Sequence, residues 1–211
     1  MTTLILCKDR QILHDGTRRY DARKLAWAPL DTSAPEGKPV SAAEAIRWLY
    51  KETNMRLVPI GVIGPREATK QQIAVAEHLG KQLGELGIPV LNGGKDGVME
   101  ATSKGCTAAG GMVLGFVPGD DWTEANDYVT VPIATGIGKA RNVLIARASL
   151  ALVAVGGGYG TLSEMAFGLH FDKPVFALEG APDIEGVQYM ECVEDVIKAL
   201  LLIILQLPGE S

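Results

Sequence analysis

The pattern of hydrophobic and polar positions changes near residue 56. From residue 57 onward, short apolar runs alternate with longer amphipathic stretches. The expected strands are residues 57–64, 88–92, 112–119, 127–133, 150–155 and 173–178, and the expected helices are 69–87, 96–111, 138–149, 161–171 and 193–205. Several strands are unbroken apolar runs, which is typical of a parallel sheet covered by helices on both faces. We therefore predict an α/β fold with a doubly wound, Rossmann-like parallel sheet, whose ligands bind at the carboxyl ends of the strands.

Residues 1–55 have a different pattern of apolar and polar positions. Two short apolar runs flank Asp15 and Gly16, and an Asp-Gly pair predicts a β-hairpin because both central residues of its turn take positive φ. Ser41 and Glu44 have the spacing of a capping box at the start of a helical pattern. We expect a small β-hairpin and helix appendage in residues 1–55, followed by a nucleotide-phosphate-binding Rossmann-like domain in residues 56–211.

Composition and charge limit the classes of partner. The 211 residues carry a formal net charge of −5, which argues against a nucleic-acid partner because phosphate neutralisation needs a basic surface. The apolar run at 199–207 is too short to span a bilayer, so we expect no membrane association. Cys7, Cys106 and Cys192 have neither metal-ligand nor redox spacing and predict reduced thiols in the cytoplasm. We expect no metal and no resident cofactor.

The most informative motif lies in residues 151–169, where five apolar residues run into a cluster of glycines. Its spacing fits neither the dinucleotide fingerprint, nor the Walker loop, nor the nucleophile elbow of serine hydrolases. What remains is a strand, a glycine turn and a helix expected to begin at Thr161, whose first N–H groups favour an anion. A single phosphate is the expected ligand, and a ligand-free connection between strand and helix is the alternative. The residues expected to bind the phosphate are Gly157, Gly158, Tyr159, Gly160 and Thr161.

Two further glycine loops follow predicted strands. The loop after residues 88–92 contains Gly93 and Gly94, and the loop after residues 57–64 begins at Gly64. Because neighbouring parallel strands end at the same edge of a sheet, the three loops are expected to line one crevice. We expect Gly64, Gly93 and Gly94 to contribute to phosphate or nucleotide binding there.

A carboxylate follows the glycine loop closely. Thr161 and Glu164 have capping-box spacing, so in the simpler interpretation Glu164 caps its own helix. The apolar stripe of that helix, Leu162, Met165, Ala166 and Leu169, is expected on the opposite face. This turns Glu164 toward the crevice or the solvent, and the helix N-terminus favours its ionised form. Arg141 lies among apolar residues, where an arginine usually pairs with a carboxylate or phosphate. We therefore expect Arg141 to pair with Glu164.

The stretch from Arg141 to Glu164, RNVLIARASLALVAVGGGYGTLSE, resembles the LOG ("lonely guy") phosphoribohydrolases. Those enzymes have an arginine and then the motif P-G-G-x-G-T-x-x-E at the same spacing, and NGGKDGVMEA resembles their second loop, G-G-G-x-x-G-L-M-G-A. The resemblance covers residues 57–200. It implies cleavage of the N-glycosidic bond of cytokinin riboside 5′-monophosphates, with Arg141 and Glu164 as the catalytic residues. The older label of this superfamily, lysine decarboxylase, has no support in these residues.

Two positions depart from the LOG pattern: Gly156 replaces the proline of the motif, and Glu100 replaces a glycine of the second loop. These features, together with TGIGKARN at residues 135–142, look more like a sister branch that includes the molybdenum-cofactor carrier proteins. The resemblance to the carrier proteins implies binding of the phosphorylated pterin without chemistry.

Two functional hypotheses follow. The first is hydrolysis of a purine- or cytokinin-type nucleoside 5′-monophosphate to free base and ribose 5-phosphate, with Glu164 stabilising an oxocarbenium-like state and activating water while Arg141 holds Glu164. The second is a non-catalytic carrier or sensor that binds molybdenum cofactor or a nucleotide at the same anion site. In both cases we expect a homodimer or larger homo-oligomer. The resemblance implies pairing through helices beside the active site, and the segments NVLIA and ALLLIIL are more apolar than a single buried face requires.

Overall fold

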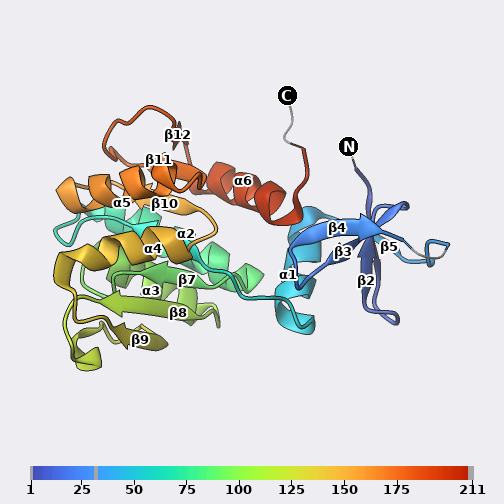
Figure 1. Ribbon diagram of the computed structural model, residues 1–211, viewed down its shortest axis with the longest axis horizontal. Coiled ribbons are helices and arrows are strands. Elements are labelled where there is room, and N and C mark those ends of the chain that lie inside the picture. The colour runs from blue at the N-terminus through green and yellow to red at the C-terminus, as the bar shows by residue number, and fades with distance from the viewer. Residues whose placement is uncertain (1, 31–32, 209–211) are drawn as a thin grey trace. The chain divides into compact units, whose positions relative to one another are not determined.

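The computed structural model describes residues 2–30 and 33–208, and these residues form two compact units (Figure 1). One unit spans Val58–Ile197. The other contains the described residues before Val58 together with the end of the chain from Lys198.

The unit Val58–Ile197 is built on a seven-stranded sheet in which every neighbouring pair of strands is parallel. The strand order is β12-β11-β10-β6-β7-β8-β9, so the chain runs outward from β6 to β9 and then returns to the other side of β6 at β10. This confirms the predicted doubly wound sheet and places its switch point between β6 and β10. The strands are β6 Ile60–Ile63, β7 Val90–Asn92, β8 Val113–Val117, β9 Val131–Ala134, β10 Leu152–Val155, β11 Val175–Leu178 and β12 Gln188–Tyr189.

Two pairs of helices pack against this sheet, α2 with α3 and α4 with α5 (Figure 1). All residues of β6, β10 and β11 are buried, as expected for strands covered on both faces. The ends of α2 lie close to those of the predicted helix over 69–87. Gly87 ends the helix with left-handed backbone, and Thr69 and Gln72 form a capping box at its start. The helices are α2 Lys70–Leu86, α3 Val98–Ala108, α4 Asn142–Ala148, α5 Tyr159–His170 and α6 Val193–Leu205, with short 3₁₀ turns η1 Trp122–Glu124 and η2 Gly138–Arg141.

The N-terminal part contains the predicted helix, and the predicted hairpin is part of a larger sheet. β2 and β3 pair antiparallel across the turn at Asp15 and Gly16, and α1 begins with the capping box of Ser41 and Glu44. The sheet has five strands in the order β4-β3-β2-β1-β5. Strands of three or four residues are too short to show a clear alternating pattern, which is why the sequence predicted a single hairpin here. The elements are β1 Leu4–Cys7, β2 Ile12–His14, β3 Arg18–Asp21, β4 Ala26–Pro29, β5 Lys38–Val40 and α1 Ala42–Glu52.

The end of α6 belongs to the same unit as this five-stranded sheet. The Tyr20 hydroxyl donates to the carbonyl of Ile204, and the Trp27 indole Nε1 donates to the carbonyl of Leu205 at 2.6 Å. These bonds satisfy carbonyls of the last helical turn that have no partner inside the helix. The apolar side chains of this helix are therefore largely buried within the chain itself, among them Val196, Leu200, Leu201, Ile204 and Leu205. Within residues 2–30 and 33–208, no helix has the length and apolar character needed to cross a membrane.

Candidate functional site

A cavity of about 520 Å³ lies where the loops after β6 and β10 meet. This is the switch point of the sheet, the place where doubly wound folds bind their ligands. Its walls come from the loop after β6, from α3, from η2 and the start of α4, and from the first turns of α5. The lining residues are Gly64, Pro65, Arg66, Met99, Lys139, Arg141, Asn142, Gly158, Tyr159, Gly160, Thr161, Ser163 and Glu164.

Helix α5 begins two residues earlier than the sequence predicted. Its first residue is Tyr159, its N-cap is Gly158, and no side chain caps its first N–H groups. Thr161 and Glu164 therefore both lie inside the helix, and the expected capping box between them is not formed. Because the first N–H groups of a helix have no partner within it, the turn at Gly158–Thr161 presents donors and the positive end of the helix dipole at the cavity.

The buried face of α5 also differs from the expected one. The predicted stripe was Leu162, Met165, Ala166 and Leu169, whereas the buried residues are Thr161, Glu164, Met165 and Gly168. Gly168 brings the helix close to the sheet, since an added Cβ there would lie 2.5 Å from a methyl of Leu152 and 2.9 Å from one of Val175. This contact turns Glu164 inward, toward the cavity and away from open solvent.

Arg141 and Glu164 form an ion pair with 3.2 Å between Nη1 and Oε1. Their side chains are 10% and 8% exposed, so the pair is buried at the base of the cavity. The guanidinium also donates to the side-chain oxygen of Asn142, while its buried Nε has no hydrogen-bond partner among the described residues. Gly93 makes room for the pair, because a Cβ on Gly93 would lie 2.8 Å from the Arg141 guanidinium carbon.

Burial changes the protonation chemistry of this pair. The pKa of Glu164 is raised to about 7. Burial raises this pKa, and the nearby positive charge of Arg141 lowers it by a smaller amount. The pKa of Arg141 is lowered by burial and by the charge of Arg66, and raised by Glu164. The carboxyl group therefore exchanges a proton close to neutral pH, where the sequence predicted a fully ionised group. A carboxyl group with such a pKa is suited to general acid or base chemistry.

Asn142 connects the start of α4 to the glycine loop. Its side-chain amide donates to Ser163 Oγ at 3.0 Å and to the carbonyl of Gly160 at 3.3 Å. Ser163 Oγ donates in turn to the carbonyl of Gly160 at 2.6 Å. Sequence reasoning did not single out Asn142, although it directly follows Arg141 in the motif TGIGKARN. The network holds the first turn of α5 beside the Arg141 side chain.

The structure divides the glycines predicted to bind phosphate into two groups. Gly64, Gly158 and Gly160 line the cavity, whereas Gly93 and Gly94 are not among its lining residues. Gly93 lies against the Arg141 guanidinium. The N–H of Gly94 donates a hydrogen bond of 2.8 Å to the side-chain oxygen of Asn92. Gly157 is also absent from the lining and packs against Thr161. Of the other predicted residues, Tyr159 and Thr161 line the cavity, and Tyr159 is 93% exposed.

Gly156 takes a backbone conformation that the LOG motif's proline cannot adopt. Its φ is +60°, whereas a proline ring holds φ near −65°. A proline at this position would therefore need a different backbone conformation, and a Cβ on Gly156 would also meet the side chain of Gln72 from α2.

Sequence reasoning missed several lining residues besides Asn142. Arg66 and Lys139 bring two further positive charges to the cavity, and Met99 contributes an apolar wall from α3. Arg66 follows Gly64 in the loop IGPREAT, and Lys139 stands two residues before Arg141. Their closeness to predicted site residues was the available signal, but a lone surface cation is usually only a solvated side chain.

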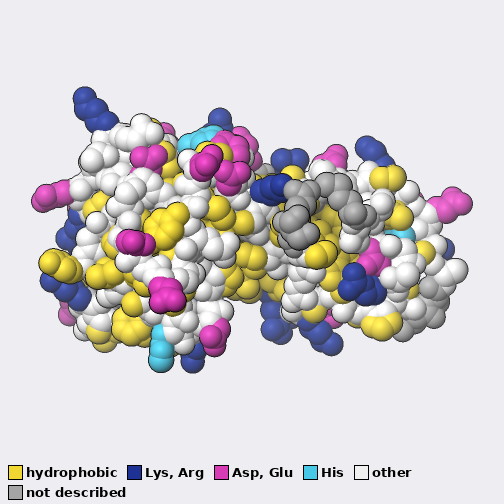
Figure 2. All heavy atoms as spheres, turned by 90° about the horizontal axis from the view of Figure 1, so that it is seen from above, with side chains coloured by type: hydrophobic (Ala, Val, Ile, Leu, Met, Phe, Trp, Pro, Cys, Tyr) yellow, Lys and Arg dark blue, Asp and Glu magenta, His cyan; other side chains and the backbone are white. Residues whose placement is uncertain are grey.

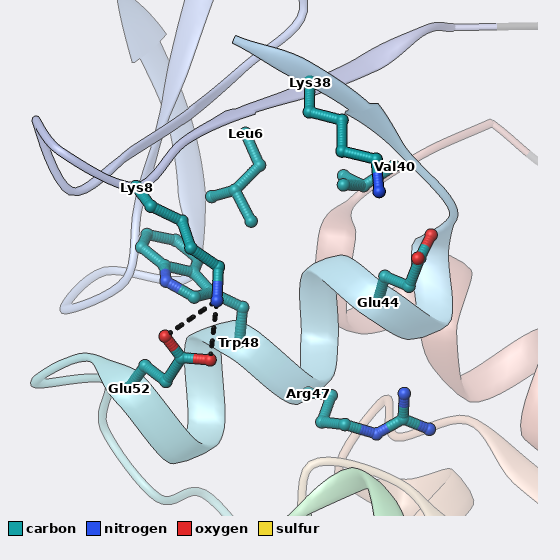
Figure 3. Close-up of a pocket in the computed structure, with 8 residues that line it drawn as sticks. All are labelled: Leu6, Lys8, Lys38, Val40, Glu44, Arg47, Trp48 and Glu52. Carbon is teal, nitrogen blue, oxygen red and sulfur yellow. Dashed lines mark hydrogen bonds and ion pairs between the residues drawn. The ribbon is translucent and has the colours of Figure 1, made fainter.

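A second cavity, of about 340 Å³, lies in the N-terminal unit between α1, β1 and β5 (Figure 3). Lys8 Nζ bonds both carboxylate oxygens of Glu52 at 3.0 Å, and the Glu44 carboxylate accepts from the N–H and hydroxyl of Ser41. Both acidic groups of this cavity are thus engaged by the local structure. We therefore place the candidate functional site at the cavity that contains Arg141 and Glu164.

Comparison with known proteins finds relatives that share the part of the chain containing this site. The chain is 41% identical over 143 residues to an uncharacterised protein of Archaeoglobus fulgidus. The match covers 68% of this chain and 94% of that protein. It is 36% identical over 104 residues to a probable cytokinin riboside 5′-monophosphate phosphoribohydrolase of rice, Oryza sativa subsp. japonica. That match covers 48% of this chain and 42% of the rice protein.

A solved structure is similar to this chain over most of its length. The molybdenum cofactor carrier protein of Chlamydomonas reinhardtii superposes with a TM-score of 0.65 and 38% identity, over 70% of this chain and 98% of that one. These findings confirm the resemblance to the LOG-like superfamily and its position near the molybdenum-cofactor carriers. Residues 57–201, which contain the whole candidate site, match the sequence profile of the SLOG cluster4 family, and the chain therefore belongs to that family.

Proposed function

We propose that this protein hydrolyses the N-glycosidic bond of a nucleoside 5′-monophosphate with a purine- or cytokinin-type base. The observation that carries the proposal is the buried pair of Arg141 and Glu164, which lies in the same cavity as the uncapped first turn of α5. An anion-binding helix terminus next to a carboxyl group with a pKa near neutrality is what such a reaction requires. The partial similarity to the rice enzyme supports the same reaction.

In this proposal the phosphate binds at Gly158–Thr161, which anchors the ribose with C1′ near Glu164. The bond between C1′ and the base nitrogen breaks through an oxocarbenium-like state, whose positive charge the Glu164 carboxylate stabilises. A water oxygen then bonds to C1′, and Glu164 accepts one proton of that water. Glu164 then gives up this proton, which the departing base nitrogen takes up, so that the products are free base and ribose 5-phosphate. Arg141 fixes the Glu164 carboxylate through the 3.2 Å ion pair.

A second candidate function is non-catalytic binding of molybdenum cofactor or a nucleotide at the same anion site. Two observations favour it: the extensive similarity to the Chlamydomonas carrier protein, and the positive φ of Gly156, which separates this loop from the proline-containing LOG motif. In a carrier, the Arg141–Glu164 pair supports the loop and performs no reaction.

The experiment that separates the two functions is incubation with a panel of nucleoside 5′-monophosphates, followed by chromatography for free base and ribose 5-phosphate. Release of base by the parent protein, lost in Glu164→Gln, supports the hydrolase. No release from any nucleotide, together with copurification or uptake of molybdenum cofactor, supports the carrier.

We also propose that the protein is a homodimer or larger homo-oligomer, and that it acts in the cytoplasm. Helices α4 and α5 pack side by side and leave Leu144 and Phe167 exposed by 39% and 37%. Figure 2 shows that hydrophobic side chains are exposed among charged ones on the face it presents. The apolar residues of α6 do not support this proposal, because most of them are buried within the chain itself.

A further inference from the structure

Arg66 and Lys139 lie on the wall of the candidate site, Arg66 in the loop IGPREAT and Lys139 in the motif TGIGKARN, and neither belongs to the stretch from Arg141 to Glu164. Arg66 belongs to the loop after β6, and Lys139 belongs to η2. Within the part of the chain that the structure describes, neither side chain has a hydrogen bond or an ion pair. Two positive charges from separate segments therefore converge on one cavity without an anionic partner.

Two positive charges on the cavity wall, those of Arg66 and Lys139, belong to exposed side chains without an acidic partner among the described residues. Arg141 is compensated by Glu164 through their ion pair, which leaves the charges of Arg66 and Lys139 uncompensated. Arg66 lies near enough to Arg141 to lower the pKa of that guanidinium. Like charges gathered at one place oppose each other unless an anion lies between them. Two exposed cations without a partner at one cavity therefore favour a ligand that carries negative charge.

Both cations are attached to backbone that neighbouring segments hold in place. The N–H of Val98 donates to the carbonyl of Pro65 at 3.1 Å, which fixes the residue before Arg66 against the start of α3. The N–H of Gly138 donates to the carbonyl of Pro118 at 2.9 Å, which fixes the residue before Lys139 against the end of β8. The two side chains thus extend from defined positions at the mouth of the cavity.

We propose that Arg66 and Lys139 are the counter-charges of a phosphomonoester dianion, and that they make the site select phosphomonoesters over phosphodiesters and uncharged sugars. This inference rests on the proposed anion site at the first turn of α5. A phosphomonoester carries two negative charges above its second pKa of about 6, whereas a phosphodiester carries one. Two unpaired cations match the dianion, and the helix N-terminus alone does not distinguish the two esters as strongly.

The test uses ribose 5-phosphate, its methyl phosphodiester and ribose as probes, because none of them contains a base that the protein could release. Calorimetry at pH 8, where the monoester is a dianion, compares the parent with Arg66→Ala, Lys139→Ala and the control Lys70→Ala. Lys70 is exposed at the start of α2 and does not line the cavity. A thermal unfolding curve for each variant checks that the fold is intact.

We expect Arg66→Ala and Lys139→Ala each to weaken ribose 5-phosphate binding by roughly 10-fold or more, since hydrogen bonds to charged groups are strong. The preference for monoester over diester should shrink in both variants, and Arg66→Lys should retain most of it. Lys70→Ala should bind like the parent. If both alanine variants bind ribose 5-phosphate as tightly as the parent, the inference is overturned while the anion site at α5 stands. If the parent binds no phosphomonoester, the anion site itself is wrong, and the inference falls with it.

Discussion

The side chains of Arg141 and Glu164, 23 residues apart in the chain, meet in a buried ion pair at the switch point of the sheet. α5 carries the carboxylate, and the arginine comes from the short turn that precedes α4. Burial of both groups leaves the carboxyl with a pKa of about 7 and the arginine Nε without a partner among the described residues. The Glu164 carboxyl can therefore exchange a proton near neutral pH, and the Arg141 Nε is able to donate to a ligand.

Glu164→Gln should separate catalysis from structure. Glutamine keeps the shape and loses the charge, so a hydrolase should lose about 10²- to 10⁴-fold in kcat, the usual contribution of a positioned acid or base. Binding of ribose 5-phosphate should stay within a few-fold of the parent or improve, because a negative charge near the phosphate is removed. Base release measured beside thermal unfolding checks this. Equal base release by parent and variant would exclude a catalytic role for Glu164.

Arg141→Ala should destabilise the fold, and more at pH 8 than at pH 5. Removal of the guanidinium leaves the buried Glu164 carboxylate without its cation, and breaking a buried pair in this way costs about 3–5 kcal/mol. Part of this loss should be absent at pH 5, because the carboxyl is then protonated and needs no counter-charge. Urea unfolding at pH 5 and pH 8 measures the difference. A loss that is the same at both pH values would contradict the assigned pairing.

Gly158→Val should block the phosphate without straining the fold. A Cβ added at Gly158 meets no atom within 4 Å, and its φ is not in the left-handed region, so a side chain is accommodated in the empty cavity. The same side chain would occupy the space next to the first N–H groups of α5, where the anion is expected. AMP affinity should fall by at least about tenfold, a loss of roughly 1.4 kcal/mol. Adenosine, which lacks the phosphate, serves as the control and should bind equally weakly to both proteins.

The stability of the parent should fall between pH 5 and pH 8 relative to Glu164→Gln. The folded pKa of Glu164, about 7, lies above its ordinary value of 4.5, so folding favours the protonated group. Its stabilising effect is complete below pH 4.5 and is lost as pH rises through the folded pKa. Melting temperatures of the two proteins across this range test the sign. A parent that gains stability over the variant as pH rises would show that Arg141 outweighs burial.

Leu144→Glu should disrupt the proposed homo-oligomer. This exposed leucine lies on α4 beside α5, and a carboxylate there would be desolvated in an interface between copies. Sedimentation at micromolar concentration should show a shift from dimer to monomer. Met112→Glu is the matched control, because Met112 is also 39% exposed but lies outside these helices. A parent that sediments as a monomer would remove the basis of the prediction.

Much of the fold and part of the site were predictable because they depend on residues close together in the chain. The caps of α2 at Thr69 and Gly87, and the apolar run of β10, are encoded within a single turn or strand. The pairing of Arg141 with Glu164 was also predictable, since an arginine in an apolar helix requires a partner and the motif spacing indicated one. These features follow from local hydrogen bonding and burial, which the order of the residues expresses directly.

Other features were decided by residues far apart in the sequence. The contact of Gly168 with Leu152 and Val175 sets the rotation of α5, and it is this rotation that buries Glu164 and raises its pKa. The hydrogen bonds from Tyr20 and Trp27 bring the end of α6 to the N-terminal sheet across more than 170 residues. Arg66 and Lys139 reach one cavity because the loop after β6 and the 3₁₀ turn η2 before α4 both line it. Desolvation and the convergence of charge depend on which segments the tertiary structure brings together, and a linear pattern does not contain that information.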